Sequence, residues 1–263
     1  MKELFLGPLI AFVLFLVITR VLEWLKPRGR RLPVLRRGFA TDAAYWFFTP
    51  IVTKAVTHIA LIAALIPVAL LIYGQLDRAQ LLDGFGPQSR LPVWVQAAAM
   101  LVIADFIGYW MHRIFHRGRL WKFHAVHHSS VDLDWLSSVR VHPVNDALMK
   151  IAAALPLIAL GFKPDALAVI TPILTIMAIL VHANVDWDFG PLRRMIVSPR
   201  FHRWHHTDEA AAIDKNFAGL FPIWDIVFGT YHMPAGQVPS TFGTSTPVPP
   251  GLLGQLVFPF RKP

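Results

Sequence analysis

The stretch DFIGYWMHRIFHRGRLWKFHAVHH, residues 105–128, contains two histidine patterns, H-x-x-x-H and then H-x-x-H-H. A second H-x-x-H-H, HRWHH, follows at residues 202–206. On a helix, positions i, i+3 and i+4 share a face, so each pattern can direct its imidazoles toward a common point. The histidines of the three patterns are His112, His116, His124, His127, His128, His202, His205 and His206.

Imidazole clusters of this kind indicate metal binding. Neutral imidazole is the commonest protein ligand for transition metals and binds through one ring nitrogen. A tetrahedral zinc ion accepts about four ligands, and eight imidazoles exceed that number. The sequence therefore predicts two metal ions.

The composition places the chain among membrane proteins. Of its 263 residues, 55% are hydrophobic and 16% are charged, which is too apolar for an ordinary soluble domain. The formal charge is +9, but the basic residues flank apolar runs, which favours membrane topology signals over nucleic-acid binding. The chain has no cysteine, which excludes disulfides and thiolate metal sites. No small-residue cleavage site follows the first apolar run, so we expect a retained anchor.

Three apolar runs predict membrane spans, at residues 4–25, 55–76 and 91–111. Two shorter apolar arms within residues 151–181, separated by GFKPD, predict a helical hairpin that leaves and re-enters on one side. We therefore expect an all-α integral membrane bundle of about three spans plus a hairpin, with a histidine-rich cap formed by the segment after residue 190.

The basic loop KPRGRRLPVLRR, residues 26–37, predicts the orientation, because loops rich in Lys and Arg stay in the cytoplasm. The weakly basic loop at residues 77–90 then lies outside, and every histidine pattern falls on the cytoplasmic face. No linker divides the chain, so we expect a single domain over residues 1–263. Its parts would be N-terminal spans (1–100), a catalytic region (101–235) and a Pro-rich tail (236–263).

Outside the patterns, Asp105 lies on the same helical stripe as His112 and His116. A carboxylate near the end of an apolar span is costly and usually functional. We expect Asp105 to accept a hydrogen bond that orients a ligand imidazole. The alternative is a pairing with Arg113 or a side chain that reaches the membrane interface.

Four further histidines have no spaced partner. His142 and His182 are each weak candidates alone, but the predicted topology returns both to the face that carries the other eight. His58 and His232 have no comparable support, and we expect them to be structural. The motifs H-E-x-x-H, G-x-S-x-G, the P-loop and G-x-G-x-x-G are absent, so zincin, α/β-hydrolase and nucleotide-binding chemistry lack support.

Together these motifs resemble the fatty acid hydroxylase/sterol desaturase superfamily of membrane di-metal oxygenases. The three histidine patterns match, as do RVHP at residues 140–143, HAN at 182–184, NFAG at 216–219 and WDIVFGT at 224–230. The resemblance covers residues 105–231, about half the chain. Phe217 and Ala218 depart from the common Tyr-Gly of the closing signature. Residues 213–219 also resemble alkylglycerol monooxygenases. A histidine at position 142, by contrast, resembles the sterol desaturases of the superfamily.

The resemblance implies an iron-dependent, dioxygen-using enzyme that acts on a lipid in the bilayer. It implies two iron ions, for which zinc can substitute in purified protein, and a separate electron-transfer protein as the external electron donor. The substrate would be a sterol-like, fatty-acyl or ether lipid, and the product an alcohol or an alkene. By resemblance the metal ligands are His112, His116, His124, His127, His128, His182, His202, His205 and His206, with His142 as a tenth.

Two other functions remain open at this stage. Imidazole clusters bind zinc well, so a zinc-dependent membrane hydrolase is possible, although no glutamate lies within a histidine pattern to act as general base. A metal transporter or metal-binding membrane protein is the third reading. Transport sites usually lie near mid-bilayer, whereas these histidines gather at one face.

Overall fold

The computed structural model describes residues 2–27, 31–75 and 82–261 of the chain. Within these residues the fold is helical, and the only β-type pairings are two isolated bridges, Pro27 with Val185 and Thr207 with Phe242. The expected all-α class is confirmed. Parts of four predicted features lie outside the described residues: the start and end of the single domain, the middle of the basic loop, Leu76 at the end of the second span, and residues 77–81 of the outer loop.

Four helical segments are long and apolar enough to cross a membrane: Phe5–Leu25, Phe39–Ile72, Val93–Phe115 and Asp165–His182. They belong to α1 (Lys2–Leu25), to α2 (Phe39–Phe48) continued by α3 (Lys54–Tyr73), to α5 (Val93–Phe115) and to α8 (Asp165–His182). The three predicted spans are confirmed, and the second arm of the hairpin is itself long enough to be a fourth. The chain is an integral membrane protein.

The second span begins sixteen residues earlier than its apolar run predicts, at Phe39 rather than at residue 55 (39 against 55). A π-helical turn, Thr49–Thr53, joins α2 to α3 without a break. Pro50 lies in this turn, where its missing N–H makes a local change of helix register expected. Asp42 lowers the hydropathy of α2, so the apolar pattern alone does not predict this helix. In the structure, however, the Asp42 side chain is fully buried against two arginines.

The predicted hairpin is formed by α7 (Pro143–Ala159) and α8. Its turn contains Gly161 at φ 82°, and a Cβ there would come within 2.3 Å of the Phe85 carbonyl oxygen. The Phe85 N–H in turn donates to the Gly161 oxygen at 3.0 Å. Glycine is therefore required where the α3–α5 connection packs against the hairpin.

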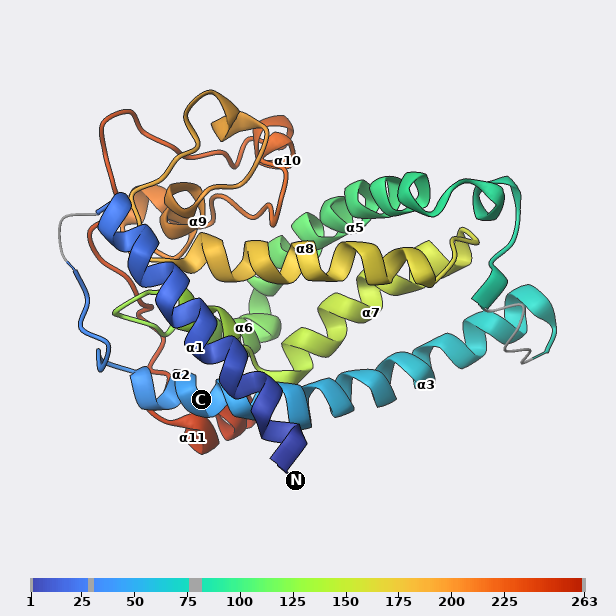
Figure 1. The fold of residues 1–263 in the computed structure, drawn as a ribbon, viewed down its shortest axis with the longest axis horizontal. Coiled ribbons are helices and arrows are strands. Elements are labelled where there is room, and N and C mark those ends of the chain that lie inside the picture. Colours follow the sequence, from blue (N-terminus) through green and yellow to red (C-terminus); the bar gives the residue numbers. More distant parts are fainter. Residues whose placement is uncertain (1, 28–30, 76–81, 262–263) are drawn as a thin grey trace.

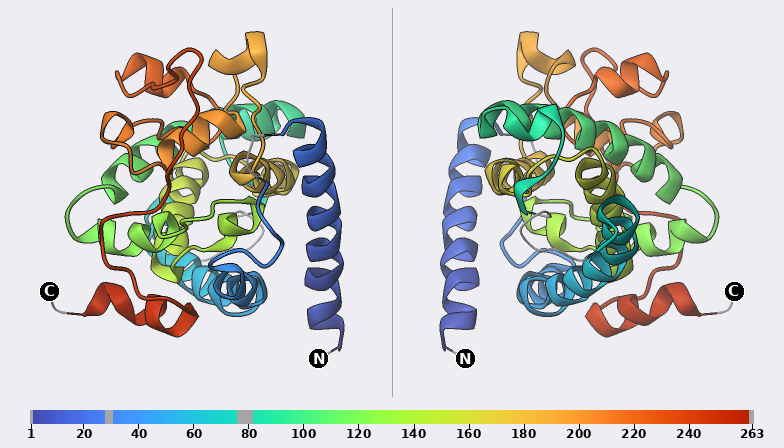
Figure 2. Two further views of the ribbon diagram at one scale, coloured as in Figure 1. Left: turned by 90° about the vertical axis from the view of Figure 1, so that its left-hand side faces the viewer. Right: turned by 90° about the vertical axis from the view of Figure 1, so that its right-hand side faces the viewer.

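The long helices and the histidine-bearing segments occupy different parts of the molecule (Figure 1). α3, α5, α7 and α8 extend together toward one side, whereas α6 (Trp121–His128), α9 (Pro199–His205) and α10 (Ile223–Val227) gather toward the other. α1 stands at the edge of the bundle in both side views (Figure 2). Its Phe12 and Phe15 pack against Trp46 and Trp135, which anchors the middle of α1 to these two rings.

Within the described part of residues 191–263 there is no candidate span, as expected for a cap. The Pro-rich tail is not wholly irregular, however. It contains α11 (Leu252–Val257) and a 3-10 turn, Phe258–Phe260. In α11, Gln255 is buried on the inner face while Leu253 and Val257 are exposed on the outer one.

A buried charge network joins the basic loop and α2 to the 3-10 segment Trp135–Val139. Asp42 accepts from Arg36 Nη2 at 2.7 Å and from Arg140 Nε at 2.5 Å. Arg36 also bonds Asp134, which caps the Trp135–Val139 segment by accepting from the Leu136 N–H. The network fixes Arg140, whose backbone reaches the histidine cluster described next.

Candidate metal centre

Nine imidazoles from four segments meet in two groups, and the nitrogens within each group lie within 4.8 Å of one another. α5 and its C-cap, α6, α8, and α9 with its C-cap supply them. The first group has five members and the second has four. The first is His112, His116, His124, His128 and His205, and the second is His127, His182, His202 and His206.

The two H-x-x-H-H patterns divide their histidines between the groups in reciprocal fashion. His124 and His128 belong to the first group and His127 to the second, whereas His202 and His206 belong to the second and His205 to the first. The groups are in contact, because the rings of His128 and His206 stack with centroids 4.4 Å apart. Each pattern therefore contributes to both of two neighbouring sites.

Hydrogen bonds to oxygen fix the orientation of many of these rings. In the first group, Nδ1 of His112 donates to Phe217 O at 2.7 Å and Nδ1 of His205 to Lys215 O at 2.9 Å. His124 donates likewise to Asn145 Oδ1, and His116 to the Asp214 carboxylate. A neutral imidazole has one N–H, so Nε2 of each ring carries a lone pair directed at the centre.

The second group is held in the same way. His127 Nδ1 donates to Arg140 O at 3.1 Å, and His182 Nδ1 to Ala178 O at 2.6 Å. Both backbone acceptors lie outside the histidine patterns. Their contacts set the tautomer of the two rings, leaving Nε2 of each free to bind a metal.

The facing nitrogens form a site that suits a cation. His112 Nε2 and His124 Nε2 are 2.9 Å apart, and His127 Nε2 and His182 Nε2 are 3.2 Å apart, with a lone pair rather than a proton on each atom. Two nitrogens bound at right angles to one metal ion at roughly 2.1 Å would be about 3.0 Å apart. Nε2 of His116 and of His205 is also buried without a hydrogen-bond partner among the described residues. The donor set therefore fits metal ions.

The electrostatics of the site keep the rings neutral. Burial, reinforced by the neighbouring imidazoles, holds the pKa of His124, His128, His205 and His206 well below its usual value. At His116, burial lowers the pKa, while the bond to Asp214 opposes that shift. Only the neutral imidazole has a lone pair for a metal, so the site is prepared for metal binding at neutral pH.

Local sequence explains how α9 presents its histidines. Ser198 caps the helix by accepting from the Phe201 N–H at 3.2 Å, and Pro199 occupies its first position, where no N–H is needed. His202 and His205 follow on the helix, and His206 is its C-cap. Phe217 packs against the rings of His112 and His205 and helps exclude water.

Asp105 does not contact an imidazole, contrary to the sequence-based expectation. Its carboxylate accepts from the N–H groups of Leu220 and Phe221 and from the Trp224 indole. It therefore anchors the loop after Phe217, whose carbonyl holds His112. The carboxylate acts on the ligand through this loop, because α5 carries it too far along the span to reach the rings.

Asp225 fixes the same loop from its other end. It is fully buried and accepts from the N–H groups of Phe217 and Ala218, each at 2.8 Å, and from Thr230 Oγ1. Burial raises the pKa of Asp225, and these hydrogen bonds oppose the shift. Since the Phe217 and Ala218 contacts are made by backbone N–H groups, the departure from Tyr-Gly leaves them intact.

His142 lies outside both groups, unlike the tenth ligand that the resemblance implies. Its Nε2 donates to Leu256 O at 3.1 Å, and its Nδ1 accepts from the Val144 N–H at the start of α7. Both ring nitrogens are therefore occupied, and no lone pair is left for a metal. His58 and His232 also lie outside the groups.

Several contributing residues were not predicted. Asn145 follows His142 by three positions and Asp214 precedes NFAG by two, so proximity to motifs was the only signal. The carbonyls of Arg140, Ala178, Lys215 and Phe217 gave none, because every residue has a backbone oxygen.

Comparison with known proteins agrees with this arrangement. Residues 97–230, which hold all nine imidazoles, match the sequence model of the fatty acid hydroxylase family. The chain belongs to this family. No solved structure matches it.

The names of similar proteins refer to different lipids. The chain is 37% identical over 173 residues to an ornithine lipid hydroxylase of Rhizobium tropici, covering 65% of this chain and 52% of that protein. It is 33% identical over 156 residues to the human alkylglycerol monooxygenase, covering 59% and 34%. A rice very-long-chain aldehyde decarbonylase is 26% identical over 165 residues, covering 55% and 25%. The chain thus spans about half the length, or less, of these relatives.

Proposed function

We propose that this fatty acid hydroxylase family member is a membrane di-iron enzyme that uses dioxygen to hydroxylate a C–H position of a lipid. The observation that carries the proposal is the pair of adjoining nitrogen-only groups, in which ring nitrogens with lone pairs face one another. The nine imidazoles would hold two iron ions. Five donors in the first group exceed the four of a tetrahedral zinc site.

When bound, the iron pair would supply the capacity to activate dioxygen for attack on an unactivated C–H bond. The chain's own residues orient and protect the site. The backbone carbonyls keep the imidazoles in the metal-binding tautomer, and the aromatic packing of Phe217 and Trp121 excludes water. Desaturation would use the same site, with the reacting carbon of the lipid held in a different position.

A separate electron donor is part of the proposal. Conversion of R–H and O2 into R–OH and water consumes two electrons and two protons, which neither substrate provides. A redox protein that reaches the histidine groups from the aqueous side would deliver them. The Asp214 side chain is 57% exposed and bonds the His116 ring, so it links the aqueous surface of the protein to the first group.

The proposed substrate class rests on the names of two relatives. The two relatives are named for the oxygenation of an ornithine lipid and of an alkylglycerol. We propose a lipid of this kind in preference to a sterol, because neither relative is named for a sterol.

Product analysis tests this function. The purified full-length chain, loaded with ferrous iron and given reductant, is expected to add one oxygen atom from labelled O2 to an ornithine lipid or an alkylglycerol. Mass spectrometry of the lipid would detect it. Label from water instead, or conversion in the absence of O2 by the zinc-loaded protein, would favour the hydrolase reading.

We also propose that the histidine groups face the cytoplasm. The Asp186 N–H donates to Lys26 O, so the predicted cytoplasmic loop lies beside the end of α8 that carries His182. Because the chain has no cysteine, Gln237→Cys in the cap and Gln75→Cys after α3 give single labelling sites. A membrane-impermeant thiol reagent on intact cells is expected to label Gln75→Cys, and to label Gln237→Cys only after lysis. The reverse pattern would invert the topology.

A further inference from the structure

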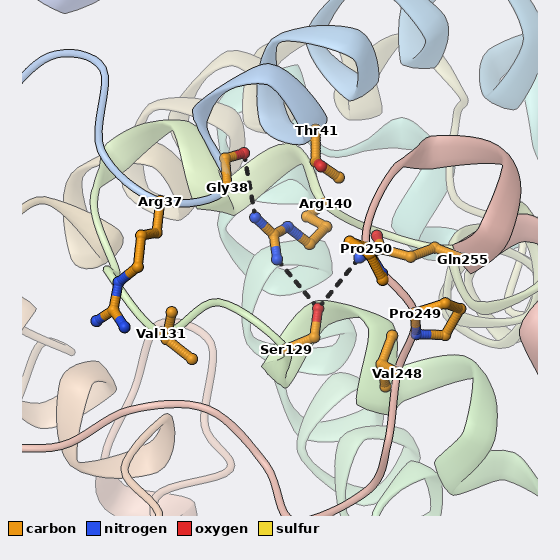
Figure 3. Close-up of a pocket in the computed structure, with 10 residues that line it drawn as sticks. All are labelled: Arg37, Gly38, Thr41, Ser129, Val131, Arg140, Val248, Pro249, Pro250 and Gln255. Atoms are coloured by element: carbon orange, nitrogen blue, oxygen red, sulfur yellow. Dashed lines mark hydrogen bonds between the residues drawn. The ribbon is translucent and has the colours of Figure 1, made fainter.

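A cavity of about 200 Å³ lies next to the end of α6, the helix that carries three of the histidines (Figure 3). Four parts of the chain line it: the start of α2, the end of α6, Arg140, and the tail that leads into α11. The side chains of Arg140, Ser129 and Gln255 point toward one another across it, whereas the Arg37 guanidinium is turned outward. None of these four residues is a member of a histidine group.

Arg140 has hydrogen-bonding capacity to spare in this cavity. Its guanidinium has five N–H groups. The contacts made are Nε with Asp42 at 2.5 Å, Nη1 with Ser129 Oγ at 3.1 Å and Nη2 with Gly38 O at 3.4 Å. One N–H remains on each Nη atom, and such a pair suits the two oxygens of a carboxylate.

Gln255 provides an open acceptor next to these donors. Its side chain is 2% exposed, and its Oε1 has no hydrogen-bond partner among the described residues. Its Nε2 reaches Ser129 Oγ at 3.5 Å. Ser129 cannot satisfy Oε1, because its single hydroxyl proton goes to Val126 O at 2.7 Å. A buried amide oxygen left unpaired is costly, so a donor from outside the chain is expected there.

The charges around the cavity balance. Arg36, Arg37 and Arg140 are paired with Asp42, Asp132 and Asp134. A dianion such as phosphate would find no surplus positive charge. A group of zero net charge that carries both a carboxylate and a donor fits the unpaired N–H groups and the unpaired amide oxygen better than a dianion does.

We propose that this cavity binds a zwitterionic amino-acid headgroup of the lipid substrate, with its carboxylate at Arg140 and its ammonium group at Gln255 Oε1. The proposal rests on the lipid hydroxylase function and deepens it. Two residues that line the cavity are linked to the metal groups, because Ser129 follows His128 directly and Arg140 O accepts from His127. The exposed apolar side chains of Leu253, Val257 and Phe260 on the outer face of the adjoining tail suit a lipid neighbour.

The test compares Gln255→Leu with Gln237→Leu, an exposed position in the same tail. The full-length, iron-loaded protein is assayed with an ornithine lipid, which has an amino-acid headgroup, and with an alkylglycerol, which has only hydroxyls. For Gln255→Leu we expect the KM for the ornithine lipid to rise roughly tenfold or more with kcat unchanged, because one hydrogen bond to a charged group is lost. The KM for the alkylglycerol should rise several-fold less, since its hydroxyls can make only a neutral hydrogen bond to Gln255 Oε1, which is weaker than one from an ammonium group.

A binding measurement separates this inference from the proposed activity. The ornithine lipid is expected to raise the melting temperature of the wild-type protein and of Gln237→Leu, and to raise that of Gln255→Leu much less. If neither lipid is oxidised by wild type, the proposed activity on these lipids fails, while the melting result still decides the headgroup site. Equal KM values and equal melting shifts for both variants would overturn the site. A KM rise of the same size for both lipids would overturn the amino-acid headgroup.

Discussion

His205→Ala is expected to empty the first histidine group while leaving the second filled, and to lower activity by more than about 100-fold. Replacing even a residue that only supports a metal ligand typically costs about 10- to 100-fold in affinity or activity. His205 itself directs an otherwise unpartnered Nε2 at the group and is held there by Lys215 O. Elemental analysis of the detergent-purified protein would show iron falling from about two ions per chain to about one.

His206→Ala provides the complementary result. His206 belongs to the second group, where its Nε2 lies 3.1 Å from Nε2 of His202. Iron should again fall to about one per chain, but combining the two changes should remove both ions. His142→Ala is the control and should retain both irons, since its ring nitrogens already bond Leu256 and Val144. Wild-type iron content and activity in both single variants would remove His205 and His206 from the ligand set.

Asp42→Ala is expected to destabilise the protein by about 3–5 kcal/mol, the usual cost of removing one partner from a buried ion pair. The Asp42 side chain is 0% exposed and serves both Arg36 and Arg140. Its loss leaves Arg140 without the carboxylate that orients it. In a protein of this size the melting temperature in detergent should fall by roughly 10 °C.

Asp188→Ala is the matched control for that measurement. Asp188 is partly exposed and pairs with Arg200 at 3.3 Å, while Arg200 keeps Asp186 as a second partner at 2.7 Å. Loss of this exposed pair costs at most about 1 kcal/mol, and loss of the hydrogen bond that Asp188 accepts from the Gly190 N–H costs about 1 kcal/mol more. Asp42→Asn, which keeps the size and one acceptor, should fall between the two and guards against a variant that does not fold. Equal melting temperatures for Asp42→Ala and Asp188→Ala would contradict the role of the network.

Much of the fold could be predicted because its cause is local. A long apolar run must cross or be buried in a membrane, so α1, α3, α5 and α8 were visible. The start of α2 was not, because Asp42 resembles a loop residue until its two arginine partners are brought to it. Gln255 was missed for the same reason, since its burial depends on α11 packing against α2 and on the contact with Ser129 at the end of α6.

The sequence by itself determined most of the membrane helices and the imidazole chemistry of the cap, because hydropathy and residue type are properties of the chain. Only the tertiary structure decided which imidazole belongs to which group. The i and i+4 members of each H-x-x-H-H pattern join one site and the i+3 member joins the other, since the rings of α6 are in direct contact with those of α9 and its C-cap. The tertiary structure also decided that His142 caps a helix and that Asp105 supports a loop. Spacing shows which side chains share a helix face, but the partners on that face come from other parts of the chain.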